Sequence, residues 1–334
     1  MWHLPRGFPT PAVPSDNPMS EAKVALGRRL FFETRLSVTG VYSCASCHDP
    51  ARAFSDGRSV ARGATGSALP HNSLALVNVA YNLSFGWDKP AVRSLEAQMR
   101  TPLLNRHPIE LGVAGRERTL CAQLAADPSY ARDFAAAFRA APPAAQPPRA
   151  PTADRQVTFV HLVQAIAAFE RTLISGDSPF DRYVFAADHE ALSAEAKRGM
   201  ALFFSARVGC AGCHSGFNFA GNWRDAQGPT GPPSFARNGT SARPLRVPTL
   251  RNIALTAPYM HDGRFATLAA VLEHYSALGA RTAAGNPPLD RRLPRSALTA
   301  GERTELGAFL ASLTDESFVR RFAAAVDDTA AHPR

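Results

Sequence analysis

Two short segments of this sequence combine cysteine and histidine at the same close spacing. Each has two cysteines separated by two residues and followed at once by a histidine: Cys44, Cys47 and His48, then Cys210, Cys213 and His214. In a CxxCH segment the two thiols add across the vinyl groups of a haem, and the imidazole becomes a ligand of its iron. The sequence therefore predicts two covalently bound c-type haems, with the two histidines as proximal ligands.

Zinc is the alternative partner of paired cysteines, and the spacing argues against it. Structural zinc sites usually bring two CxxC pairs within about 15 to 20 residues of each other. The pairs here begin at residues 44 and 210, and a histidine follows each of them. The fifth cysteine, Cys121, lies in a segment expected to be helical, where we interpret it as a small side chain of the core.

The chain is long enough for two domains, and its composition indicates where they divide. It has 334 residues, and five prolines fall among alanines between Ala140 and Asp154, a composition that cannot continue a helix. We therefore expect an N-terminal cytochrome c-like domain over residues 1–150 and a C-terminal one over residues 151–334, each with one haem. A second stretch rich in glycine and proline, residues 221–248, is expected to be irregular.

Most of the remaining sequence has the pattern of helices, so the expected fold is mainly α with long loops. Apolar residues recur at spacings of three and four over residues 156–174. Ser193 and Thr299 are positioned to cap helices, and Asn17, which precedes a proline, is expected to start another. An internal repeat supports two similar domains, because a charged helical start leads to the same Leu-Phe-Phe triplet ahead of each haem motif.

The composition also excludes several classes of function. No run of about 18 apolar residues is present, so no membrane span is expected. The formal net charge of +9 is spread along the chain rather than gathered in one cluster, which argues against nucleic acid as a partner and allows an acidic protein. Because covalent haem attachment in bacteria normally follows export, we expect a periplasmic protein whose signal peptide has been removed.

Several further segments bear a family resemblance. Four of them resemble the signature of the bacterial di-haem cytochrome c peroxidase and MauG family: CHDPARAF at residues 47–54, GWD at 86–88, VPTLRNI at 247–253 and TAPYMHDG at 256–263. Residues 4–9, 17–31 and 169–176 are similar to the MbnH-like, methanobactin-operon subgroup of MauG-type enzymes. The resemblance covers most of the chain and implies a di-haem peroxidase architecture.

This resemblance implies an enzyme that uses hydrogen peroxide. MauG-like and MbnH-like enzymes form a high-valent, bis-ferryl type state spread over both haems and oxidise a residue of a partner protein. For the MbnH-like subgroup, that residue is a tryptophan, converted to kynurenine on an MbnP-like partner. Two alternatives stay open: a di-haem cytochrome c peroxidase that takes electrons from a small redox protein, and a non-catalytic electron-transfer cytochrome with both irons blocked by strong ligands.

For the first haem, the resemblance implies an open distal pocket lined by Glu110, with Gln98 and Pro102 nearby. A carboxylate there can take a proton from one peroxide oxygen and return it to the leaving one. His71 is the candidate for a distal ligand, and we favour an iron that is open without it. Trp87 resembles the tryptophan between the two haems of this family, where an indole passes electrons; a plain core aromatic is the alternative.

For the second haem, the resemblance implies a tyrosine ligand. Tyr275 lies twelve residues after the glycine of the HDG motif, where ordinary peroxidases of the family have methionine and MauG has tyrosine. A tyrosinate is an anionic ligand that lowers the iron potential and favours highly oxidised iron. Met260 is the rival axial ligand, and His274 is a further contender.

The resemblance also implies one calcium ion between the haems. Asn72 matches a ligand of that site in MauG, together with the backbone carbonyls of Thr256 and Pro258. Oxygen ligands of this kind suit a hard cation, and water molecules would complete its shell.

Overall fold

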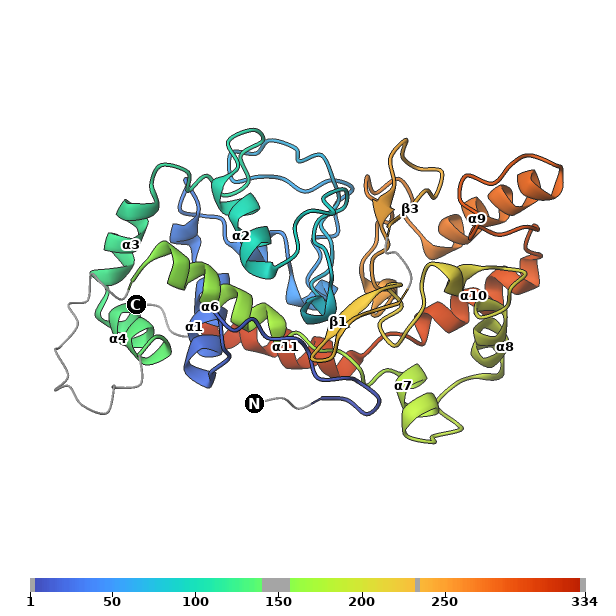
Figure 1. Ribbon diagram of the computed structural model, residues 1–334, viewed down its shortest axis with the longest axis horizontal. Helices are drawn as coiled ribbons and strands as arrows, with labels where there is room; N and C mark the ends of the chain where they lie inside the picture. Colours follow the sequence, from blue (N-terminus) through green and yellow to red (C-terminus); the bar gives the residue numbers. More distant parts are fainter. Residues whose placement is uncertain (1–3, 140–156, 232–234, 331–334) are drawn as a thin grey trace.

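The computed structural model describes residues 4–139, 157–231 and 235–330. Within these ranges the chain is mostly helical, with long irregular loops (Figure 1). The α-helices are α1 (Glu21–Phe31), α2 (Leu95–Leu104), α3 (Glu117–Ala125), α4 (Pro128–Ala137), α6 (Phe159–Arg171), α7 (Pro179–Phe185), α8 (Ala194–Phe203), α9 (Leu268–Ala283), α10 (Ala300–Ala311) and α11 (Glu316–Ala330). The mainly α class predicted from the sequence is confirmed.

The remaining regular elements are small. Short 3₁₀ turns occur at η1 (Thr34–Leu36), η2 (Cys44–Ser46), η3 (Pro50–Arg52), η4 (Val79–Tyr81), η5 (Cys210–Gly212) and η6 (Ile253–Leu255). Two antiparallel hairpins pair β1 (Trp223–Asp225) with β2 (Gly228–Thr230), and β3 (Phe235–Ala236) with β4 (Leu245–Arg246). Both hairpins lie in the stretch that was expected to be irregular, so that expectation was too simple.

The helix starts follow local capping chemistry at most of the expected places. The Ser193 hydroxyl accepts the Ala196 amide at 3.1 Å, and Thr299 forms a capping box at the start of α10. The start predicted at Asn17 is wrong. Ser20 caps α1 instead, because the Asn17 side chain is buried and donates to Glu96 Oε1 at 2.6 Å.

The internal repeat extends to a pair of crossed helices in each half. Helix α1, ahead of the first haem motif, packs on α6, and α8, ahead of the second, packs on α10. A glycine lies at each crossing: Gly27 faces the backbone carbonyl of Ala165, and Gly199 faces that of Glu305, so closely that a Cβ on either glycine would collide with the oxygen. The two crossings share one geometry, which only glycine permits.

Two hydrophobic cores lie side by side along the long axis of the molecule (Figure 1). The first core includes residues of α1, α3, α4 and α6. Phe318 of α11, near the C-terminal end of the chain, also packs in this core. The second is built mainly on α8, α9 and α10. The expected boundary at residues 140–154 lies outside the described residues, so the division at residue 150 stays a prediction. In the described ranges, no helix is both long enough and apolar enough to span a membrane.

The glycine crossings generate a stability prediction. Gly199→Ala should lower the free energy of unfolding by about 1–3 kcal/mol or more, because the new methyl group forces α8 away from α10. Gly301→Ala is the matched control, since no atom lies within 4 Å of a Cβ at that exposed helical position. It should raise the free energy of unfolding by about 0.5–1 kcal/mol. Denaturant unfolding of the two variants measures both effects, and equal stabilities would contradict the tight crossing.

Candidate functional site

The first CxxCH segment forms a tight turn that fixes its histidine. In η2 the amide of His48 donates to the Cys44 carbonyl at 3.0 Å. The imidazole Nδ1 lies 2.9 Å from the carbonyl oxygen of Phe54, a residue with a left-handed φ of 62°. This bond places the proton on Nδ1 and leaves Nε2 free as a metal ligand. Burial lowers the pKa of His48, so the imidazole is neutral, the form that binds iron.

The second CxxCH segment repeats this geometry almost atom for atom. The amide of His214 donates to the Cys210 carbonyl at 2.9 Å, and its Nδ1 lies 2.9 Å from the carbonyl oxygen of Phe219, whose φ is 50°. Burial lowers the pKa of His214 to about 4. The same turn, the same ring orientation and the same neutral state are therefore present twice.

Each turn opens onto its own large cavity. The first measures about 1580 Å³ and the second about 1570 Å³, both including their open mouths. The motif cysteines are free thiols on the cavity walls, and burial raises the pKa of Cys47 to about 11 and that of Cys210 to about 12. Two neutral thiols and one oriented imidazole on the wall of a large cavity fit a covalently attached haem.

The first cavity brings together all the residues predicted for its distal side. Glu110, Gln98 and Pro102 line it together with His48. Burial raises the pKa of Glu110, while Lys89 and a 3.4 Å bond from the Asn105 amide act in the opposite direction. The Gln98 Oε1 atom is buried and has no hydrogen-bond partner among the described residues.

His71 also lines the first cavity, next to a second histidine. Its Nε2 lies 3.7 Å from Asp88 Oδ2, and its ring centroid is 5.6 Å from that of His261. The Nδ1 atoms of both histidines are buried and form no hydrogen bond within the described ranges. His71 therefore lies close to the carboxylate of Asp88 on the wall of the first cavity.

The second cavity contains two of the three candidates for an axial ligand. Tyr275 on α9 and Met260 both line it with His214. Asn238 lies between these two, since its amide contacts the Met260 sulfur at 3.6 Å and also bonds to the phenol of Tyr275. Burial raises the pKa of Tyr275. His274 instead directs its Nε2 at the Asn238 carbonyl, 2.9 Å away.

One wall separates the two cavities, and Trp87 belongs to it. Trp87 and Asn72 line both cavities. The indole Nε1 donates to the Asn72 carbonyl at 2.8 Å, and the Trp87 carbonyl accepts the amide of Arg246 at 2.7 Å. The tryptophan is therefore held on both its side chain and its main chain.

The three residues predicted to bind calcium meet at the same wall. Asn72, Thr256 and Pro258 all line the second cavity, and the Asn72 amide nitrogen lies 3.4 Å from the Pro258 carbonyl oxygen and 2.6 Å from that of Arg58. Within the described residues there is no cluster of three or more His, Cys, Asp or Glu that could hold a metal ion. Any cation here would depend on neutral oxygen ligands, with the Asn72 amide turned to present its oxygen.

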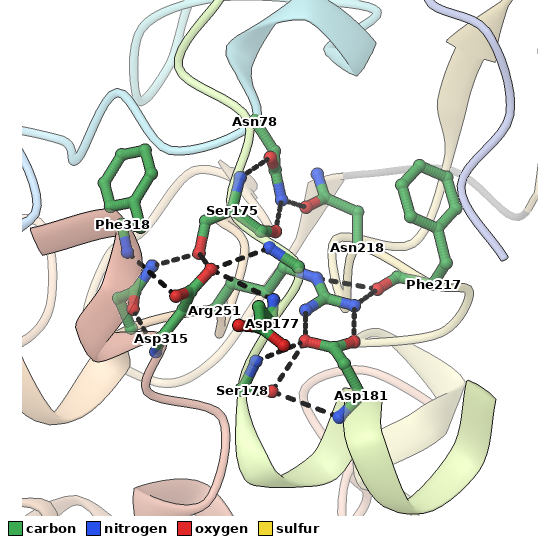
Figure 2. Close-up of polar contacts among 12 residues, drawn as sticks. Asn78, Ser175, Asp177, Ser178, Asp181, Phe217, Asn218, Arg251, Asp315 and Phe318 are labelled. Atoms are coloured by element: carbon green, nitrogen blue, oxygen red, sulfur yellow. Dashed lines mark hydrogen bonds and ion pairs between the residues drawn. The ribbon is translucent and has the colours of Figure 1, made fainter. Parts of the chain in front are cut away.

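A buried polar network joins several segments of the chain, and its Arg251 also lines the second cavity (Figure 2). Arg251 donates to both oxygens of Asp181, at 2.8 and 2.9 Å, and both side chains are almost fully buried. Asn78 accepts the Ser175 amide at 2.8 Å, and the Ser175 hydroxyl donates to Asp315 at 3.1 Å. Residues from four distant parts of the sequence are thereby fixed together.

Sequence reasoning missed several charged residues of the cavities, among them Arg246 and Glu170. Arg246 lines both cavities, and Glu170 lines the first, where burial raises its pKa to about 8. Arg246 gave no signal because it is one of several arginines in a loop rich in glycine and proline. Glu170 lies on the apolar helix α6, and a buried glutamate in such a helix was the signal that could have identified it.

Comparison with known proteins assigns the family. Residues 21–189 match the di-haem cytochrome c peroxidases. The methylamine utilization protein MauG of Methylorubrum extorquens is 36% identical over 91% of this chain and 81% of its own length. Cytochrome-c peroxidase IdrP1 of Denitromonas iodatirespirans is 34% identical over 92% of this chain and 85% of its own. A crystal structure of a MauG-like protein associated with microbial copper homeostasis has a TM-score of 0.83 and 36% identity, covering 96% of this chain and 97% of the other. Together with its two CxxCH cavities, these matches show that this chain belongs to the di-haem cytochrome c peroxidase and MauG family, a group of haem-dependent oxidoreductases with two c-type haems.

Proposed function

We propose that this enzyme uses hydrogen peroxide to oxidise a tryptophan of a partner protein to kynurenine. The observation that supports this most is the pairing of two unlike cavities across one wall. The first is lined by an acid, Glu110, as well as by its histidine, and the second is lined by a phenol, Tyr275. A cavity that admits peroxide and a second one that stores an oxidising equivalent are what oxidation of a distant protein residue requires.

Bound haem iron supplies the redox chemistry, and the protein supplies the proton chemistry around it. The carboxylate of Glu110 accepts a proton from peroxide and returns it to the departing oxygen as water forms. Gln98 lines the same cavity with an unpartnered carbonyl oxygen, which can hold the peroxide by accepting a hydrogen bond from its second O–H group. Burial keeps the pKa of Glu110 raised, which makes its ionised form a stronger base in the first transfer.

In the second cavity we assign the distal ligand to Tyr275 rather than Met260. A phenolate matches the positive charge of ferric iron and favours the oxidised metal, whereas a thioether favours the reduced one. Met260 has a left-handed φ of 71° at the HDG turn, and its sulfur contacts the Asn238 amide. We also assign Trp87 as the electron relay between the cavities, and one calcium ion to Asn72, Thr256 and Pro258.

The overall reaction balances with two molecules of hydrogen peroxide per tryptophan. The indole C2–C3 bond is cleaved, and each of these two carbons gains one oxygen atom. The products are N-formylkynurenine and two molecules of water. Hydrolysis of the formyl group then gives kynurenine and formate. The electrons leave the partner through the protein, so the partner needs only to dock on the surface, and we place the reaction in the periplasm with an MbnP-like partner.

Reduction of peroxide with electrons from a small cytochrome is the second candidate, and the likeness to the cytochrome-c peroxidase IdrP1 favours it. The two functions differ in their electron source. The peroxidase consumes a reduced cytochrome and leaves its partner unmodified, whereas the proposed enzyme consumes electrons from a protein side chain.

The partner reaction can be tested by mass spectrometry. Proteins encoded in the same operon are incubated with the diferric, haem-loaded enzyme and hydrogen peroxide. We expect one tryptophan on one of them to lose a carbon and gain an oxygen, the change from tryptophan to kynurenine. Rapid peroxide consumption that requires a reduced small cytochrome, with every tryptophan unmodified, would support the peroxidase instead.

The role of Glu110 predicts a pH dependence. The ionised carboxylate is the proton acceptor, so the rate constant for reaction with peroxide should fall as the pH decreases through the raised pKa of Glu110. Glu110→Gln should lower this rate constant by about 10²–10⁴-fold and abolish that acid limb. Glu190→Gln, at an exposed acid, is the control and should keep the wild-type profile. Stopped-flow measurement across pH decides, and an unchanged acid limb in the Glu110 variant would exclude it as the base.

The assignment of Tyr275 can be tested against its rival in one pair of variants. Tyr275→Phe should change the optical and electron paramagnetic resonance spectra of the low-spin haem and abolish the long-lived spectral response of the diferric protein to stoichiometric peroxide. Met260→Leu should leave both signals as in the wild type, because the residue is not a ligand. The reverse result, with loss in the Met260 variant only, would assign the ligand to Met260.

A further inference from the structure

The wall between the two cavities contains a single charged side chain. Among the described residues, those that line both cavities are 72–75, Asn82, Trp87 and Arg246. All except Arg246 are neutral. A guanidinium group therefore lies where the two haem sites approach each other.

Arg246 is buried and has no acidic partner in the described part of the chain. Its residue is 7% exposed, no ion pair joins it to an aspartate or glutamate, and burial lowers its pKa to about 10. The two other arginines on the second cavity are both paired, Arg251 with Asp181 and Arg292 with Asp290. Burial of a cation without a counter-ion is strongly unfavourable, so this site calls for an anion from outside the polypeptide.

The bonds that Arg246 does form leave its outer nitrogens available. Its Nε donates to the Gly86 carbonyl at 3.1 Å, and its main-chain amide donates to the Trp87 carbonyl at 2.7 Å. The guanidinium fork that remains matches a carboxylate in size and planarity and can bind it with two parallel hydrogen bonds. Each haem has two propionate carboxylates and no other anionic group.

We propose that Arg246 binds a haem propionate at the wall between the cavities and so positions that haem relative to Trp87. The arginine is then a positioning residue. Its side chain binds the haem carboxylate and also donates to the carbonyl of Gly86, the residue before Trp87. It would also add a positive charge at the edge of that haem, which would disfavour the ferric state and raise the reduction potential. Arg246 lines both cavities, so either haem could supply the propionate. The haem whose reduction potential changes when Arg246 is replaced is the one whose propionate Arg246 binds.

This proposal rests on haem binding at both CxxCH motifs and not on the identity of the partner. Its test therefore uses readouts that need no partner: the two reduction potentials, measured by spectroelectrochemistry, and the propionate-bending bands of the resonance Raman spectrum. Arg246→Gln should lower the potential of one haem and shift one propionate band. Arg246→Lys keeps the charge and should hold the potential near the wild-type value. Arg243→Gln removes an exposed arginine three residues away and is the control for net charge, with both readouts unchanged.

The outcomes separate the proposal from a structural role. Wild-type potentials and bands in a fully haem-loaded Arg246→Gln protein overturn it, and so does an equal loss of potential in the lysine and glutamine variants. If Arg246→Gln does not take up both haems, Arg246→Lys decides alone: a wild-type potential with a shifted propionate band supports the proposal, and an unshifted band overturns it. Oxidation of a partner tryptophan is measured separately, so loss of that activity with normal potentials bears only on the proposed function.

Discussion

The buried ion pair of Arg251 and Asp181, with the polar network around it, is the constraint on which both cavities depend (Figure 2). Asp181 accepts two bonds from the guanidinium group and two more from the amide and hydroxyl of Ser178. Asn252 joins this cluster to the next by donating to the Ser175 hydroxyl at 2.9 Å and accepting the Asp315 amide at 2.7 Å. Removal of one member of such a pair costs about 3–5 kcal/mol, because the other charge stays buried.

The position of this network in the sequence explains its importance for the site. Asn78 lies between residues 72–75 and Trp87, and Arg251 lies between Arg246 and the carbonyls of residues 256 and 258. The two loops that form the shared wall are thus anchored near their midpoints to one set of buried hydrogen bonds. Loops without regular structure acquire a fixed geometry in this way, and the wall that both cavities share is held in place.

The sequence predicts most clearly what is local in this fold. The CxxCH turns, the caps at Ser193 and Thr299 and the helix within residues 156–174 all follow from spacing over a few residues. The start predicted at Asn17 failed because a contact with Glu96, 79 positions away, engages the side chain that would have capped the helix.

The roles of Arg246 and Gly199 could not be predicted from the sequence for the same reason. Their roles depend on a second cavity and a second helix, which no local pattern contains. The roles proposed for Glu110, Trp87 and Tyr275 came from family resemblance, and the structure adds that these residues line two adjoining cavities.

Burial acts on the cavity residues in one consistent sense: it opposes their charged forms. It raises the pKa values of Glu110, Glu170 and Tyr275 and lowers that of Arg246, because each faces an interior that solvates charge poorly. A haem brings both signs of charge into that interior, with positive charge at the ferric iron and negative charge at the propionates. In the proposed arrangement, the iron stabilises the anionic oxygen of Tyr275, and a propionate stabilises the guanidinium group of Arg246. With these two proposed assignments, the groups whose charged forms burial opposes most clearly at the second cavity, Tyr275 and Arg246, each face a charge of opposite sign on the cofactor.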